Sequence, residues 1–223
     1  MRGHTSIRYA LIGLVPYTFH YDLSRAQVYQ YILLQHAIVF NDVHNFFVPV
    51  EVYKSFFCKE WLETKLSLEP FDVKNPYRNE AEKLHAKKSM DTKAIEATTN
   101  TWNGKCYPAT RDENIKILDD YLTLCEENNI RPVMFRVPVT EKYMANFNPQ
   151  LLDEFNILVE QACRKHPSAR FVDGWELEGF TYDDFYDHEH LNVHGAAKFS
   201  TCLNDFIEQL ESKDGEAQSN IIS

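Results

Sequence analysis

The stretch Tyr9-Ala-Leu-Ile-Gly-Leu-Val15 is a nearly continuous apolar run, and Pro16 closes it. Strands that lie inside a parallel sheet have this composition, because helices cover both faces and leave no side for polar residues. Two further apolar runs of strand length follow at residues 132–138 and 169–173. The three runs predict a parallel β-sheet in which the first strand is buried on both faces.

Segments with helical periodicity separate the predicted strands. The clearest covers residues 113–128, where Ile115, Leu118, Leu122 and Cys125 recur on one helical face. The other predicted helices span residues 24–40, about 50–66, 79–88, 151–165 and about 193–210. This alternation is typical of a sheet covered by helices, so we expect an α/β fold with three layers, α/β/α, around a parallel sheet.

Length and composition predict a single domain. A chain of 223 residues with 44% hydrophobic residues can bury one substantial core, which we assign to residues 1–210. Charged residues, prolines and a glycine mark residues 41–110 as a helical and loop insertion. Residues 211–223 are polar, and we expect them to form a disordered tail.

The formal net charge of -10 argues against a nucleic-acid partner, because such partners are bound mainly by Lys and Arg. The five cysteines are odd in number and form no C-x-x-C pair, so they predict ordinary thiols. The chain begins without a long apolar run, and as written it predicts a cytoplasmic protein without signal peptide or membrane anchor. We expect no cofactor.

The stretch Phe185-Tyr-Asp-His-Glu-His-Leu-Asn-Val-His-Gly195 joins the last predicted strand to the last predicted helix. It therefore lies at the carboxyl edge of the sheet, where α/β proteins bind their ligands. Asp187 and His190 are three residues apart, so the carboxylate can bond one imidazole nitrogen while the other faces the cleft. Such a carboxylate fixes the imidazole tautomer and stabilises the imidazolium. We interpret the two residues as a catalytic dyad, and Asn192 as the N-cap of the next helix.

Two other interpretations of the histidines stay open. A single histidine near a helix start is commonly a surface or capping residue. His188, Glu189, His190 and His194 are also donor types that zinc accepts. Their spacing differs from the helical His-Glu-x-x-His arrangement of metalloproteases, and we expect no metal site.

The pattern Asp187-x-x-His190-Leu191-Asn192-x-x-Gly195-Ala196 resembles the last block of the SGNH (GDSL-type) hydrolases and acyltransferases. Two segments that follow predicted strands, Pro16-Tyr-Thr-Phe19 and Pro138-Val-Thr-Glu141, are similar to the branch with the D-alanyl-transfer proteins of teichoic acid modification. The resemblance spans most of residues 7–207. It implies a flavodoxin-like SGNH fold and a serine esterase or O-acyltransferase that acts on acylated carbohydrates or cell-envelope polymers. In that family the Asp and His complete a serine triad.

The chain departs from the family pattern in its first part. It contains neither the family's Gly-Asp-Ser segment nor the block that supplies an oxyanion glycine, and its first strand looks like the family's third. The resemblance thus implies that the first two strands are lacking and that the nucleophilic serine comes from residues upstream of Met1. Tyr17 and Asn103 are the candidates for substrate or oxyanion binding.

These departures lead to three expectations. The chain as given is expected to be inactive as an esterase, and the alternative is a catalytically silent protein of the same fold that binds carbohydrate or a partner. The edge of the first strand would be exposed, which predicts self-association. The family branch is often anchored in the membrane and works outside the cytoplasm, so the resemblance leaves the compartment open.

Overall fold

The centre of the molecule is a parallel sheet of three strands in the order β1-β2-β3. The structure, a computed structural model, describes residues 7–22, 93, 95–96, 99–100 and 107–219. Its strands are β1 (Tyr9–Gly13), β2 (Arg131–Arg136) and β3 (Arg170–Asp173). Tyr9 pairs with Arg131, and Val133 pairs with Arg170. The predicted α/β class and the parallel sheet are confirmed.

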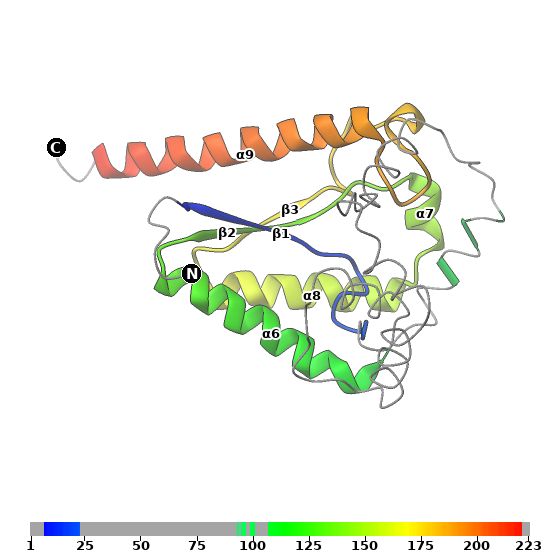
Figure 1. The fold of residues 1–223 in the computed structure, drawn as a ribbon, viewed down its shortest axis with the longest axis horizontal. Helices are drawn as coiled ribbons and strands as arrows, with labels where there is room; N and C mark the ends of the chain where they lie inside the picture. The colour runs from blue at the N-terminus through cyan, green and yellow to red at the C-terminus, as the bar shows by residue number, and fades with distance from the viewer. Residues whose placement is uncertain (1–6, 23–92, 94, 97–98, 101–106, 220–223) are drawn as a thin grey trace, which may run out of the picture.

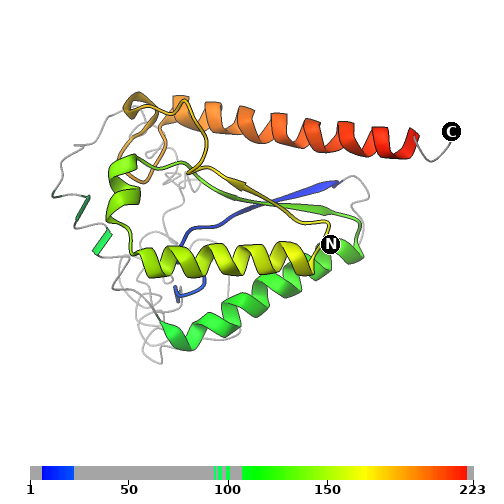
Figure 2. The same cartoon turned by 180° about the vertical axis from the view of Figure 1, so that it is seen from behind.

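Helices lie on both faces of this sheet. They are α6 (Pro108–Glu127), α7 (Glu141–Asn146), α8 (Pro149–Lys165) and α9 (Val193–Ser219), with a short 3-10 helix, η2 (Tyr182–Asp184). Figure 1 shows α9 along one face and both α6 and α8 along the other, and the reverse view in Figure 2 shows the same arrangement. The short helix α7 lies beyond the ends of the strands, near the loops that lead into α9.

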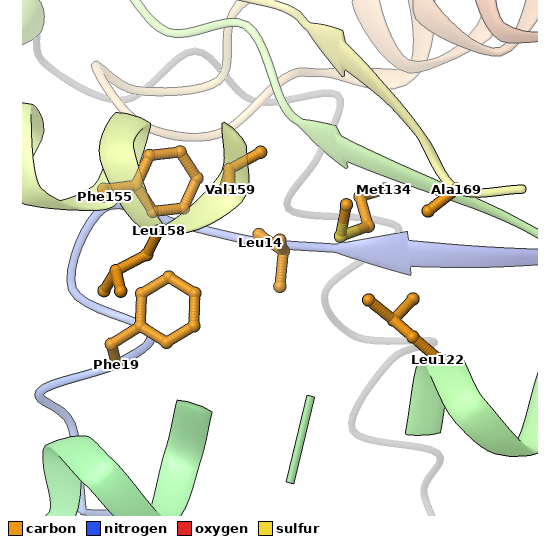
Figure 3. Close-up of a cluster of buried hydrophobic side chains, with 8 residues drawn as sticks. All are labelled: Leu14, Phe19, Leu122, Met134, Phe155, Leu158, Val159 and Ala169. Atoms are coloured by element: carbon orange, nitrogen blue, oxygen red, sulfur yellow. The ribbon is translucent and has the colours of Figure 1, made fainter. Parts of the chain in front are cut away.

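The core on the α6 and α8 side is built from leucine, aromatic and methionine side chains. Leu122 of α6 and Met134 of β2 are fully buried, and Phe155 of α8 is 1% exposed. Figure 3 shows them facing one another with Leu14, Phe19, Leu158, Val159 and Ala169. Each large apolar side chain buried in such a core contributes about 1.5–3 kcal/mol.

The opposite face of the sheet packs against α9. Val133 and Val172 point to this side and contact Phe199 and Leu203 of the helix, together with Phe185 and Leu191 from the preceding loop. Val133 and Met134 therefore take opposite faces of β2, as successive strand residues must. This contact brings the loop before α9 down onto the carboxyl ends of the strands.

Strand β1 is less buried than its apolar composition predicts. The side chain of Leu11 is 54% exposed, and Ile7, just before the strand, is 46% exposed. Among the described residues β1 pairs with β2 alone, and the side chains that α9 packs against come mainly from β2 and β3. The prediction that this strand is buried on both faces is therefore wrong for Leu11.

Element boundaries differ from the predicted ones at several points. Helix α6 begins at Pro108, five residues before the predicted start, because proline is well tolerated in the first helical turn. Helix α9 continues to Ser219, where a disordered tail from residue 211 was expected, since no proline interrupts this polar stretch. The predicted helices at 24–40, about 50–66 and 79–88, and nearly all of the predicted insertion at 41–110, lie outside the described residues.

The short elements α7 and η2 were not predicted. Helix α7 has six residues and η2 has three, too few to show an amphipathic period. The sequence marks these helices only by their capping residues. Thr140 is the N-cap of α7, and Thr181 with Asp184 forms a capping box at η2. None of the helices that the structure describes combines the length and the apolar character needed to span a membrane.

Candidate functional site

Asp187 and His190 contact each other on the loop between η2 and α9. The distance from Oδ1 of Asp187 to Nδ1 of His190 is 2.8 Å, so the predicted hydrogen bond is confirmed. Because an ionised carboxylate can only accept, Nδ1 of the imidazole carries the hydrogen. The lone pair of the neutral ring is then on Nε2, the nitrogen that can accept a proton.

Asp187 is held more firmly than the histidine. Its Oδ1 also accepts the backbone N–H groups of Glu189 at 3.1 Å and of His190 at 2.9 Å. Burial raises the pKa of Asp187, but the hydrogen bonds from the His190 ring and from these two backbone groups outweigh burial and bring that pKa below its usual value. The side chain of Asp187 is 15% exposed and that of His190 is 61% exposed. The pair thus joins a fixed carboxylate to an accessible imidazole.

The turn that carries the dyad is closed by backbone contacts. The N–H of Tyr186 donates to the carbonyl of His190 at 2.8 Å, and Phe185 and Leu191 form an antiparallel bridge. Asn192 accepts the N–H groups of His194 and Gly195 on its Oδ1, at 2.9 and 3.0 Å. This is the geometry of a helix N-cap, as the sequence predicted.

Helix α7 contacts the residues between Asp187 and His190. Oγ1 of Thr140 lies 2.8 Å from Nδ1 of His188, and the backbone N–H of Thr140 donates to the carbonyl of His188 at 3.0 Å. The hydroxyl of Tyr143 donates to Oε2 of Glu189 at 3.2 Å. No pattern in the sequence indicates these contacts, since 46 to 48 residues separate the partners.

Tyr17 lies on the segment after β1, in an aromatic cluster with Tyr143, Phe147 and Trp175. Burial, and after it the negative charge of Glu189, raises the pKa of Tyr17, so the phenol keeps its proton at physiological pH. The structure thus brings Tyr17 to the same edge of the sheet as the dyad loop. The other candidate for substrate or oxyanion binding, Asn103, is outside the described residues.

The metal interpretation finds no support in the described part of the chain. No group of three or more His, Cys, Asp or Glu side chains there is arranged to hold a metal ion. His188 is buried and its ring bonds Thr140, whereas His190 bonds Asp187 and His194 is exposed on α9. The three imidazoles therefore lie in different surroundings.

A cavity of about 480 Å³ opens beside the dyad loop, between the start of α7 and the segment that follows β3. Thr140 and Phe185 lie in its wall, so it borders both α7 and the loop that carries the dyad. Its remaining wall is about equally polar and apolar, contains three carboxylates, and comprises Pro138, Val139, Glu141, Met144, Gly174, Trp175, Glu176, Leu177, Glu178, Gly179, Phe180, Thr181 and Tyr182. A cavity of this size that combines apolar side chains with convergent polar groups can hold a small ligand.

The hydroxyls of three described serines are used elsewhere. Ser168 donates to Glu126, Ser200 to the carbonyl of Ala196, and Ser212 to the carbonyl of Gln209. None of these three contacts involves the dyad. They are ordinary structural bonds, on the loop before β3 or within α9.

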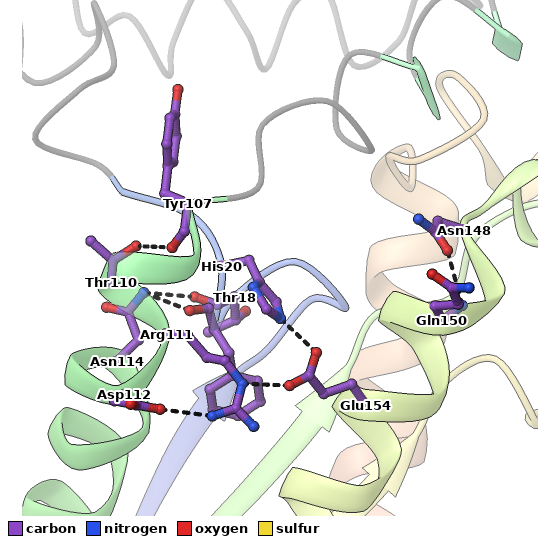
Figure 4. A network of polar contacts seen from close by, with 11 residues as sticks. Thr18, His20, Tyr107, Thr110, Arg111, Asp112, Asn114, Asn148, Gln150 and Glu154 are labelled. Carbon is purple, nitrogen blue, oxygen red and sulfur yellow. Dashed lines mark hydrogen bonds and ion pairs between the residues drawn. The ribbon is translucent and has the colours of Figure 1, made fainter.

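A second histidine and carboxylate pair occurs at the same edge and was missed from the sequence. Nε2 of His20, on the segment after β1, lies 2.8 Å from Oε2 of Glu154 on α8, and Arg111 of α6 pairs with the other carboxylate oxygen. Figure 4 shows this network, together with the amide of Asn114, which donates to the carbonyl of Thr18 at 3.2 Å. His20 is only 8% exposed, so we infer that the network has a structural role and holds the segment after β1 against α6 and α8.

Comparison with family models, with curated proteins and with solved structures finds no match. The functional assignment therefore depends on the geometry of the site and on the resemblance in its motif.

Proposed function

We propose that His190 is the base of a serine esterase or O-acyltransferase with the three-layer SGNH type of fold, and that Asp187 is the carboxylate that orients it. The observation that carries the proposal is the 2.8 Å contact between Oδ1 of Asp187 and Nδ1 of His190, in a pair whose carboxylate is mostly buried and whose imidazole is mostly exposed. A histidine that only caps a helix or lies on the surface needs no carboxylate beside it. Here the carboxylate of Asp187 is held in place by two backbone N–H groups.

In the proposed reaction His190 moves a proton twice. Nε2 accepts the proton of an attacking serine hydroxyl while the serine oxygen bonds to the ester carbonyl carbon. The imidazolium then donates that proton to the departing alcohol oxygen, as the bond from this oxygen to the carbonyl carbon breaks. Water or a second hydroxyl repeats the sequence and releases the acyl group. Asp187 stays ionised throughout and stabilises the imidazolium.

The attacking serine lies outside the described residues in this proposal, in agreement with the resemblance, which places it in an earlier segment. The cavity beside the dyad loop would receive the acyl or alcohol part of the ester. The resemblance favours an acylated carbohydrate or cell-envelope polymer as the substrate. The dyad and the cavity by themselves require only an ester that can reach an exposed imidazole.

The test compares ester turnover by the longest protein that the gene encodes around this chain with turnover by the printed chain. We expect the longest protein to hydrolyse acetyl esters and to be labelled by a fluorophosphonate, and the printed chain to do neither. His190→Ala should lower kcat by a factor of about 10³ or more, because the base is lost. His194→Ala is the matched control: it removes an exposed imidazole four residues away but keeps the backbone N–H that Asn192 caps.

Equal turnover by His190→Ala and wild type would overturn the proposal. Labelling of the printed chain that disappears on replacing one of its own serines would overturn the assignment of the nucleophile to another segment. If the longest protein binds acylated sugars without any turnover, it is the catalytically silent binding protein, the alternative that the sequence left open.

A further inference from the structure

We infer that Thr140 and Tyr143 of the α7 region are positioning residues for the dyad, acting through His188 and Glu189. The inference rests on the proposed function and adds to it the group that sets the geometry of the base. Neither residue is expected to touch the reacting atoms. Their role is to fix the two residues that separate Asp187 from His190 in the chain.

The first contact is made by Thr140, which directly precedes α7. Its hydroxyl lies 2.8 Å from Nδ1 of His188, and its backbone N–H donates to the carbonyl of His188 at 3.0 Å. Thr140 and His188 are 3% and 5% exposed. A residue bonded through both its ring and its carbonyl, and excluded from water, has little freedom to rotate, so the backbone immediately after Asp187 is fixed.

The second contact is made by Tyr143, one turn into α7. Its hydroxyl donates to Oε2 of Glu189 at 3.2 Å, and the side chain is 3% exposed. Burial, followed by the charge of Glu189, raises the pKa of Tyr143, so the phenol keeps the hydrogen that it donates. The other carboxylate oxygen of Glu189 lies 3.9 Å from Nδ1 of His190. Tyr143 therefore holds Glu189 next to the dyad.

The two contacts act on one short chain segment. The hydrogen bond between Asp187 and His190 forms only if the backbone at residues 188 and 189 has the right conformation, since these residues set the separation of the two side chains. The backbone N–H groups of Glu189 and His190 also donate to Asp187, so the same conformation orients the carboxylate. An error of about 1 Å in such a group can reduce the rate about 10²-fold.

Helix α7 is in turn fixed by the sheet. Only four residues separate the end of β2 at Arg136 from the start of α7 at Glu141. Close packing constrains this connection, since a side chain at Gly174 would meet the carbonyl of Arg136 at 2.1 Å and Pro138 at 2.7 Å. Thr140 and Tyr143 thus fix the position of the dyad relative to the sheet.

The experiment removes each hydroxyl and follows the tautomer of His190 by ¹⁵N NMR of the printed chain, a readout that needs no turnover. We expect the Nδ1–H tautomer in wild type and a mixture of tautomers in Thr140→Val and Tyr143→Phe. Thr140→Ser, which keeps the hydroxyl, should restore the wild-type spectrum. In the longest encoded protein the two variants should lower kcat about 10-fold to 100-fold and change KM less than about threefold.

Two controls separate positioning from stability. Asn148→Ala removes the N-cap of α8, as Thr140→Val removes the N-cap of α7. It therefore has a similar cost in helix stability, but the bond that it removes is made to Gln150 and not to the dyad loop. Tyr121→Phe removes a hydroxyl from an exposed residue of α6, on the other side of the sheet from α9. Both should leave the His190 tautomer unchanged.

If Thr140→Val and Tyr143→Phe lower the midpoint of unfolding but leave the tautomer and kcat as in wild type, the inference is wrong and the contacts are only structural. If they shift the tautomer in a protein that turns over no ester, the positioning role stands and the proposed function fails. If Thr140→Val does not fold, Tyr143→Phe, which removes a single oxygen atom, decides the question.

Discussion

At the scale of single residues, Oδ1 of Asp187 accepts three hydrogen bonds, two from the backbone and one from His190. Asp187→Asn keeps the shape of the side chain but loses its charge and can turn an N–H toward the ring. We expect His190 to lose its preference for the Nδ1–H tautomer and kcat of the longest encoded protein to fall about 10⁴-fold, as it does when a triad aspartate is replaced.

The same ¹⁵N NMR spectra and ester assays check this prediction. Asp183→Asn is its control, because Asp183 is exposed on η2 and its backbone carbonyl, which the substitution keeps, accepts from the side-chain amide of Asn192. A variant at Asp187 that keeps both the tautomer and the rate would show that the carboxylate does not orient the imidazole.

A second residue-scale feature lies at the other end of the molecule, where His166 links two helices. Its Nδ1 lies 3.0 Å from Glu126 and its Nε2 lies 2.9 Å from Asp119, both on α6, while the ring is 4% exposed. Both nitrogens face ionised carboxylates, so both must donate, and the ring is an imidazolium. Burial lowers the pKa of His166, but the hydrogen bonds to Asp119 and Glu126 outweigh burial and raise it.

The sign of the resulting pH dependence follows from these shifts. The raised pKa means that the stabilisation by His166 is complete below the unfolded-state value of about 6.5 and is lost as pH rises through the folded value. The bond from Lys165 and then that from His166 lower the pKa of Asp119, and the bond from His166 lowers that of Glu126. Their contributions are complete above about pH 4 and are lost as pH falls through the lowered values.

We therefore predict that His166→Gln destabilises the fold most between about pH 4.5 and 6.5, by about 1–3 kcal/mol, and less at higher pH. Urea unfolding of both proteins between pH 4 and 9 measures the difference. His194→Gln, at an exposed position, is the matched control. A destabilisation independent of pH would mean that His166 acts by packing and not by its charge.

At the scale of secondary-structure elements, Gly195 sets how closely α9 approaches η2. A Cβ atom at this position would lie 2.0 Å from the carbonyl oxygen of Asp184, which is backbone and cannot move aside as a side chain can. The same carbonyl accepts the N–H of Asn192 at 2.9 Å, so its displacement would also disturb the cap of α9. Glycine is required here by the close approach of two backbones.

Gly195→Ala is therefore expected to destabilise the fold by about 1–3 kcal/mol, the usual cost of overpacking. Gly13→Ala is the control, since its Cβ would meet only the ring of Phe135 at 3.4 Å, an ordinary contact. Urea denaturation measures both. Equal stabilities of the Gly195 variant and wild type would show that α9 can shift away from η2 at little cost.

At the scale of the whole molecule, the exposed sheet edge at β1 is the reason to expect self-association. Within the described residues β1 has one neighbouring strand, and Ile7 and Leu11 are 46% and 54% exposed. A strand edge of this kind is a template for pairing with another chain. We predict that the 26.1 kDa chain sediments as a species larger than a monomer at micromolar concentration.

Leu11→Lys should restore the monomer, because a charge on an edge strand opposes pairing. Ile157→Lys is the matched control: Ile157 is 53% exposed but lies on α8, away from the edge. Sedimentation velocity of the three proteins provides the measurement. A wild-type chain that sediments as a compact monomer of 26.1 kDa would contradict the prediction and show that this edge does not associate.

The sequence by itself determined the features that depend on neighbouring residues. The strands, the helices at 113–128, 151–165 and 193–210, and the hydrogen bond between Asp187 and His190 were all predictable, because a strand, a helical face and a contact over three residues depend on local spacing. The cap at Asn192 belongs to the same class, since its bonds reach only two and three residues ahead.

Only the tertiary structure decided which residues contact the loop that carries Asp187 and His190, and which hold the helices together. Thr140 meets His188 across 48 residues, His166 meets Asp119 across 47, and His20 meets Glu154 across 134. No local pattern marks such pairs, because their distances are set by the parallel sheet, which brings strand ends and helices from distant parts of the chain to one place. The exposed edge of the first strand was expected from the resemblance alone, whereas the apolar pattern of residues 9–15 predicted burial on both faces, because an apolar strand can have the same sequence at an edge as at the centre of a sheet.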